Sequence, residues 1–192
     1  RWLCDPSHPL TARVAINRYW QMYFGHGIVK TAEDFGSQGE APVHAELLDW
    51  LATEFVQSGW DIKRMQRLIV TSAAYRQASN HRDDVNGKDP RNLLVARHNR
   101  LRLDAEIVRD VALSASGLLN PKVGGPGVYP PIPDSVMALG QVKREWKVSG
   151  GGDRYRRGLY TFLFRATPPP ALSVFDSPDA FSTCTRRLRS NT

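Results

Sequence analysis

Residues 43–70, VHAELLDWLATEFVQSGWDIKRMQRLIV, hold the pattern that decides the fold class. Apolar residues recur there at intervals of three and four: Leu47, Leu48, Leu51 and Phe55. This spacing predicts an amphipathic helix over about 43–58, which Gly59 ends. Asp61 is a typical N-cap for a following helix with a clear apolar period: Ile62, Met65, Leu68 and Ile69. Because the connection is short, we expect the two helices to pack as an antiparallel hairpin.

Two further segments show the same helical period. The first runs from about Leu10 to Phe24 and is followed by Gly25, a typical residue at a helix C-terminus. The second begins at Asp104 and runs to about Leu118, with this expected buried stripe: Ile107, Val108, Val111, Ala112, Ala115 and Leu118. Across the four helices we expect these residues in the core: Trp20, Leu51, Phe55, Leu68, Ile69, Val108 and Val111.

The rest of the chain is rich in proline and glycine. Residues 120–153 contain NPKVGGPGVYPPIP and SGGGD, which cannot form regular helix or interior strand. Residues 157–165 favour an extended segment, and a short helix is expected near Ala171. The sequence therefore predicts a mainly α fold of about four helices with long irregular segments and little sheet. Residues 1–192 are expected to be a single domain, cut at both ends from a larger multidomain protein.

The charge of the chain comes mostly from arginine. Lys and Arg total 26 against 19 Asp and Glu, for a formal net charge of +7, and 20 of the 26 are Arg. Arginine suits both internal pairing with carboxylates and contact with anionic partners. Binding of nucleic acid requires basic residues gathered on one face. Here they are spread along the chain, so a nucleic-acid-binding domain is only a second alternative.

Familiar catalytic and metal-binding motifs are absent from the sequence. It has no phosphate-binding loop, no dinucleotide fingerprint, no G-x-S-x-G and no H-E-x-x-H. Its two cysteines, Cys4 and Cys184, have no zinc-type spacing, and without a C-x-x-C-H the chain cannot attach a c-type haem. The five histidines show no ligand spacing, so we expect no metal site. No apolar run is long enough to cross a membrane, and the N-terminal residues do not resemble a signal peptide.

Three polar groups are candidate ligand-binding positions, whether for an anion or for a carbohydrate. The first combines an early helix with the following loop: Arg13, Asn17, Arg18, Asp34 and Gln38. The second surrounds the start of the fourth helix: Arg102, Asp104, Glu106, Arg109 and Asp110. The third lies late in the chain: Arg156, Arg157, Arg186 and Arg187. Each group has two interpretations, an Arg-lined site for an anionic ligand or partner, and an internal network that ties irregular segments to the helices.

The second interpretation makes a specific prediction about four side chains. Irregular backbone needs hydrogen-bond donors, and one guanidinium offers five. We therefore expect contacts with residues 31–42 or 154–192 from four side chains: Arg13, Asn17, Arg102 and Arg109.

Six stretches, in this order along the chain, resemble one known family: HPLTARVAINRYW (8–20), DFGSQGEAPVHAELLDWLA (34–52), GWDIKRMQRLIVTSAAYRQAS (59–79), RLRLDAEIVRDVALSASGLL (100–119), RYRRGLYTFLFRATPPPALSVFDSPD (154–179) and CTRRLRSNT (184–192). Together they are similar to the C-terminal domain of unknown function of planctomycete cytochrome C domain-containing proteins. The resemblance covers nearly the whole chain.

The resemblance implies a longer, exported polypeptide and hence a periplasmic or otherwise exported location. A c-type haem is then expected in another domain, and no cofactor in this chain. Expected partners are other domains of the same polypeptide. The leading functional hypothesis is a docking or ligand-binding module of this haem-linked protein. The alternative is an extracytoplasmic redox-linked enzyme that acts on an anionic or carbohydrate substrate.

Overall fold

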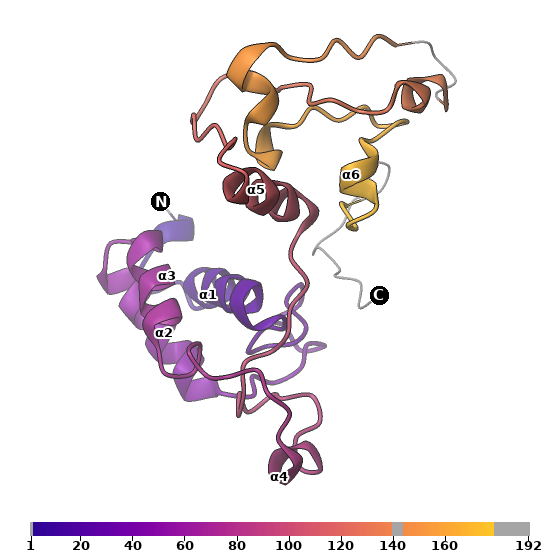
Figure 1. Ribbon diagram of the computed structural model, residues 1–192. Coiled ribbons are helices and arrows are strands. Elements are labelled where there is room, and N and C mark those ends of the chain that lie inside the picture. The colour runs from indigo at the N-terminus through magenta and orange to yellow at the C-terminus, as the bar shows by residue number, and fades with distance from the viewer. Residues whose placement is uncertain (1, 140–143, 179–192) are drawn as a thin grey trace. The chain divides into compact units, whose positions relative to one another are not determined.

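The computed structural model describes residues 2–139 and 144–178 and is mainly helical (Figure 1). Its α-helices are α1 (Thr11–Phe24), α2 (Ala45–Gln57), α3 (Ile62–Thr71), α4 (Asp83–Asn86), α5 (Ala105–Ala115) and α6 (Pro170–Ser173). Four short 3₁₀ helices add η1 (Trp2–Cys4), η2 (Asp134–Leu139), η3 (Gly151–Tyr155) and η4 (Gly158–Tyr160). Within the described ranges β-pairing is limited to isolated bridges. The predicted mainly α fold with four longer helices and little sheet is confirmed.

The chain divides into two compact units, one over Arg1–Leu101 and one beginning at Arg102. Each unit is described by itself. That residues 1–192 form a single domain stays a prediction.

Local signals set the ends of the helices in the first unit. The Asp61 carboxylate accepts a hydrogen bond from the Arg64 N–H at 3.0 Å, which caps α3 as predicted. Gly25 ends α1 at φ 87°, where its N–H donates to the Gln21 carbonyl. A side chain at Gly25 would also meet Leu101, since an added Cβ would lie 2.5 Å from it. The positive φ therefore favours glycine at this position, and any other residue would also require the Leu101 side chain to move.

The core of the first unit forms where α1, α2 and α3 contact one another. Its buried members come from these helices and the segment after α1: Ala12, Ile16, Trp20, Phe24, Ile28, Val29, Leu48, Leu51, Ala52, Phe55, Met65 and Ile69. The prediction for Leu68 is wrong, because its side chain is 36% exposed. Met65 and Ile69 are four residues apart and share the inward face of α3, whereas Leu68 is rotated about 100° from Ile69.

The second unit buries few apolar side chains and is held largely by irregular backbone. Phe162 N–H donates to the Val128 carbonyl and Val128 N–H donates to Tyr160, both at 2.8 Å. These bonds form an isolated bridge instead of a strand in the segment expected to be extended. The short helix expected near Ala171 is present as α6. Among the described residues, no helix has the length and apolar character needed to cross a bilayer.

Candidate functional site

Helix α5 contacts residues 154–158 of the second unit through polar side chains. The Asp110 carboxylate accepts a hydrogen bond from the Gly158 N–H at 2.5 Å and pairs with Arg157 at 3.3 Å. The adjacent residue, Arg109, donates to the Arg154 carbonyl at 2.8 Å. Polar and charged groups of α5 thus make its contacts with residues 154–158.

A glycine makes this close contact possible. A Cβ added at Gly158 would lie 2.6 Å from the carbonyl oxygen of Glu106 and 2.7 Å from its Cα. The η4 backbone therefore lies directly against the first turn of α5, and Gly158 is buried there. A larger residue would force the two segments apart.

The apolar stripe of α5 points away from this contact. Ile107 is 45% exposed and Val111 52% exposed, and Leu118, just beyond the helix, is 49% exposed. Ala112 and Ala115 are also exposed, and Val108 is only half-buried. The predicted buried stripe, and with it the core positions Val108 and Val111, is wrong, because the charged face occupies the side that packs against η4. Within α5, only Ala105 is fully buried.

A signal for this orientation is present in the sequence. Glu106, Arg109 and Asp110 recur at intervals of three and four, as regularly as the apolar residues do. Such a polar row is usually exposed to solvent, so the sequence pattern predicts burial of the opposite, apolar face. The sequence therefore predicts the apolar stripe of α5 but not its exposure to solvent.

The second candidate group lies around the start of α5 and is tied to the end of the described chain. Arg102 donates to the Asp176 carboxylate at 2.8 Å and to the Val174 carbonyl at 3.3 Å. Asp104 occupies the N-cap position of α5, and Glu106 lies in its first turn. Burial lowers the pKa of Arg109, and its Nε has no hydrogen-bond partner in the part of the chain that the structure describes.

Arg156 of the third group is a buried cation that organises a loop. Only 1% of it is exposed, and its guanidinium donates to the carbonyls of Lys122, Gly124 and Pro126. Its Cζ lies 3.7 Å from the ring centroid of Tyr160, whose hydroxyl accepts from the Gly124 N–H. The contacts are those of an internal network that fixes the Gly/Pro loop. Arg186 and Arg187 lie outside the described residues.

The first candidate group is dispersed over separate contacts. Asn17 is fully buried, and its amide pairs with both the N–H and the carbonyl of Val29, each at 2.9 Å. Asp34 accepts from the Gly36 N–H within its own loop. Arg18 and Gln38 are exposed.

The specific contact prediction holds for two of the four side chains. Arg102 and Arg109 contact the segment after residue 154, as expected. Asn17 instead contacts Val29, and Arg13 pairs with Asp49 of α2 at 2.6 Å. For these two the expectation of contact with residues 31–42 is wrong, because α1 packs directly on α2 and on the turn that follows α1.

The described residues contain no group of histidine, cysteine and acidic side chains that could hold a metal ion. The exposed face of α5 is apolar. No charged residue occurs between Val111 and Leu119, where most side chains are small.

A family model described as PSD1, protein of unknown function (DUF1553), matches residues 1–192. No curated protein matches the chain. No solved structure matches it either.

Proposed function

We propose that this chain, which belongs to the family described as PSD1, protein of unknown function (DUF1553), acts as a docking module. The outward face of α5, defined by Ile107, Val111, Ala115 and Leu118, binds an apolar surface of another domain of the same polypeptide. The single observation that carries the proposal is the orientation of α5, which places Arg109 and Asp110 against residues 154–158 and leaves its apolar stripe exposed.

The energetics favour covering this face. Burying one Val or Ile side chain contributes about 1.5–3 kcal/mol relative to leaving it exposed. Contiguous exposed apolar surface on a protein commonly marks an interaction site. Two or three such residues in one stripe are enough to anchor a partner when the surrounding side chains exclude water.

The composition of the face restricts the chemistry of the partner. Residues 111–119 carry no charge, so an anionic ligand or nucleic acid would find no cation there. Ala112, Ser114 and Ala115 are small and exposed, which allows a second helix to approach closely. An uncharged apolar helix face is the partner surface that fits.

The family resemblance indicates which polypeptide would contain this partner. It implies a longer, exported polypeptide with a cytochrome-c-like domain, and the outward face of α5 would then be covered within that polypeptide. The role is that of a domain that holds a haem-bearing neighbour in place.

The test measures hydrogen exchange in the 192-residue chain and in its full-length polypeptide. Backbone amides of residues 105–118 should exchange more slowly in the full-length protein, because a docked partner covers them. Val111→Asp should remove that extra protection. Val123→Asp is the matched control, since Val123 is also exposed and lies in the same unit.

Three outcomes would contradict the proposal. One is full protection of residues 105–118 in the 192-residue chain alone. Another is equal protection in the Val111→Asp and Val123→Asp proteins. The third is a concentration-dependent dimer of the 192-residue chain that Val111→Asp dissolves, which would identify a second copy as the partner.

A further inference from the structure

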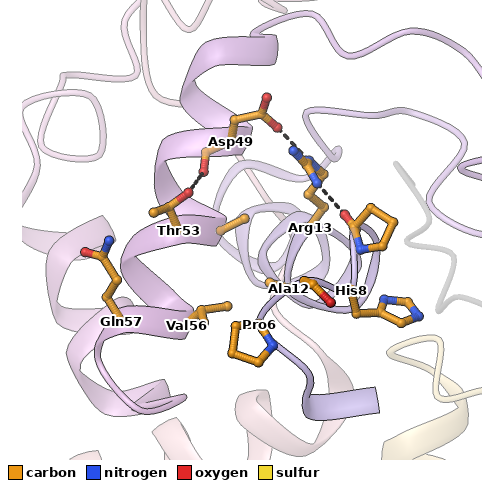
Figure 2. A pocket seen from close by; sticks show the side chains of 11 residues that line it. Pro6, His8, Ala12, Arg13, Asp49, Thr53, Val56 and Gln57 are labelled. Atoms are coloured by element: carbon orange, nitrogen blue, oxygen red, sulfur yellow. Dashed lines mark hydrogen bonds and ion pairs between the residues drawn. The ribbon is translucent and has the colours of Figure 1, made fainter. Parts of the chain in front are cut away.

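A cavity of about 440 Å³ lies in the first unit, beside α1 and α2 (Figure 2). Its wall is the segment before α1, and its other lining residues come from the two helices: Pro6, Ser7, His8, Pro9, Ala12, Arg13, Asp49, Ala52, Thr53, Val56 and Gln57. This volume is within the range of about 300–1,000 Å³ that is typical of small-molecule sites. None of its lining residues belongs to α5 or to the proposed docking surface.

The cavity arises from small residues at the contact between α1 and α2. Ala12 and Ala52 are both buried there, and their methyl groups leave space that larger side chains would fill. Val56, Pro6 and Pro9 also line the cavity. These apolar lining residues, here called the apolar floor, suit the C–H face of a ligand.

The wall of the cavity is held by His8. Its Nδ1 accepts hydrogen bonds from the N–H groups of Leu10 and Thr11 at 3.3 and 3.2 Å, and contacts the Thr11 hydroxyl at 3.0 Å. These contacts satisfy donors at the start of α1 and fix the segment of residues 6–9 against the helix. The wall is therefore part of the folded unit.

Arg13 and Asp49, which both line the cavity, form an ion pair. Arg13 Nε donates to Asp49 Oδ1 at 2.6 Å, and its Nη1 donates to the Pro9 carbonyl. Figure 2 shows Arg13 beside Asp49, with Thr53 one turn further along α2. The hydrogen bond from Arg13 lowers the pKa of Asp49, so the carboxylate stays ionised and the pair is neutral overall.

Both donors and acceptors remain available around the pair. Among the described residues, neither Arg13 Nη2, Asp49 Oδ2 nor the Gln57 amide has a hydrogen-bond partner. The Thr53 hydroxyl donates to the Asp49 carbonyl at 2.8 Å and can still accept. A ligand therefore meets donors and acceptors in similar number.

This balance decides the class of ligand. An anion would be attracted by Arg13 and repelled by Asp49. A cation would be attracted by Asp49 and repelled by Arg13. A hydroxyl group can donate to Asp49 and accept from Arg13 at the same time, so neighbouring hydroxyls can bridge the pair. We infer that the cavity is a binding site for a neutral polyhydroxylated molecule of about one sugar ring, held by Arg13, Asp49 and Gln57 over the apolar floor.

The experiment compares one ring in three charge states. The 192-residue chain is titrated with glucose, galactose and mannose, then with glucuronate and glucosamine, by ligand-observed NMR at about pH 6, where the amine is protonated. At least one neutral hexose should bind, and its charged analogues should bind about fivefold more weakly, because the neutral Arg13–Asp49 pair carries no net charge to offset the cost of removing their charge from water.

Two substitutions locate the site and test its charge balance. Gln57→Ala should weaken the neutral sugar about fivefold, because a hydrogen bond at the rim is lost. Gln38→Ala is the control, since Gln38 is exposed and does not line the cavity. Asp49→Asn should shift the preference to glucuronate, because Arg13 is then uncompensated. Far-UV circular dichroism establishes that each variant remains folded.

Specific results would overturn the inference. Absence of binding by all three neutral hexoses would do so. So would equal affinity for the neutral and charged rings, or binding that Gln57→Ala leaves unchanged. Binding of N-acetylglycinamide in preference to every hexose would show that the site takes a peptide backbone instead. None of these results depends on α5, so the docking proposal is tested separately.

Discussion

The two units of the chain are stabilised in different ways. Thirteen of the seventeen buried apolar residues in the described ranges lie before residue 101, in the core around α1, α2 and α3. The second unit buries only Ala105, Val128, Val136 and Leu172 and relies on hydrogen bonds from arginines. The free energy gained by hydrophobic burial scales with the apolar area removed from water. Burial therefore stabilises the first unit more than the second. The second leaves the apolar residues Ile107, Val111 and Leu118 exposed.

The largest effect is expected in the core of the first unit. Phe24 is 1% exposed, stacks on Trp20 with ring centroids 4.0 Å apart, and meets the edge of Tyr75. Phe24→Ala should lower the free energy of unfolding by about 3–5 kcal/mol, because it removes a large buried side chain and leaves a cavity. Chemical denaturation measures this loss. A loss below about 1 kcal/mol would show that the first unit is not held by this core.

The second unit should be most sensitive at a polar residue. Arg156→Lys keeps the charge but cannot reach three carbonyls in the fork geometry of a guanidinium, nor stack on Tyr160 in the same way. The expected loss is about 2–3 kcal/mol, from buried carbonyls left without donors. Amide exchange in residues 122–128 should accelerate together with this loss. Unchanged exchange in that loop would contradict the role assigned to Arg156.

Two apolar residues outside the core should show small effects. Leu68→Ala and Val111→Ala should each cost less than about 1 kcal/mol, since both side chains are partly in water in the folded chain. Ile69→Ala, next to Leu68 and 3% exposed, is the matched comparison and should cost about 2–5 kcal/mol. Thermal unfolding of the three proteins measures the contrast. Equal losses at Leu68 and Ile69 would reverse the assigned orientation of α3.

The smallest effect concerns pH and the first unit alone. Burial lowers the pKa of His26 below the usual histidine value of 6.5. The unfolded chain therefore binds the proton more readily, so the contribution of His26 to stability is present above pH 6.5 and is lost as the pH falls through the lower folded value. His26→Gln should flatten the dependence of unfolding free energy on pH in this range. An identical pH profile in both proteins would rule out His26 as a cause.

Comparison of sequence and structure separates local from long-range information. The ends of α1 and α3 could be predicted from Gly25 and Asp61, because a cap depends on residues within one helical turn. The docking face on α5 could not, because its apolar and charged rows are equally regular and the 3.6-residue period does not say which one is covered. The cavity beside Arg13 could not be predicted either, since it depends on two alanines and a short segment meeting in space.

By itself the sequence determined the mainly α fold, the four longer helices and most of the first core, because periodicity and capping are properties of neighbouring residues. The tertiary structure alone decided which face of α5 is exposed, through Gly158, whose missing side chain lets η4 lie against Glu106. It also decided that Arg156 holds a loop some 30 residues earlier in the chain and that Arg13 pairs with α2. These contacts join segments far apart in the sequence, and their geometry arises only when the chain is folded.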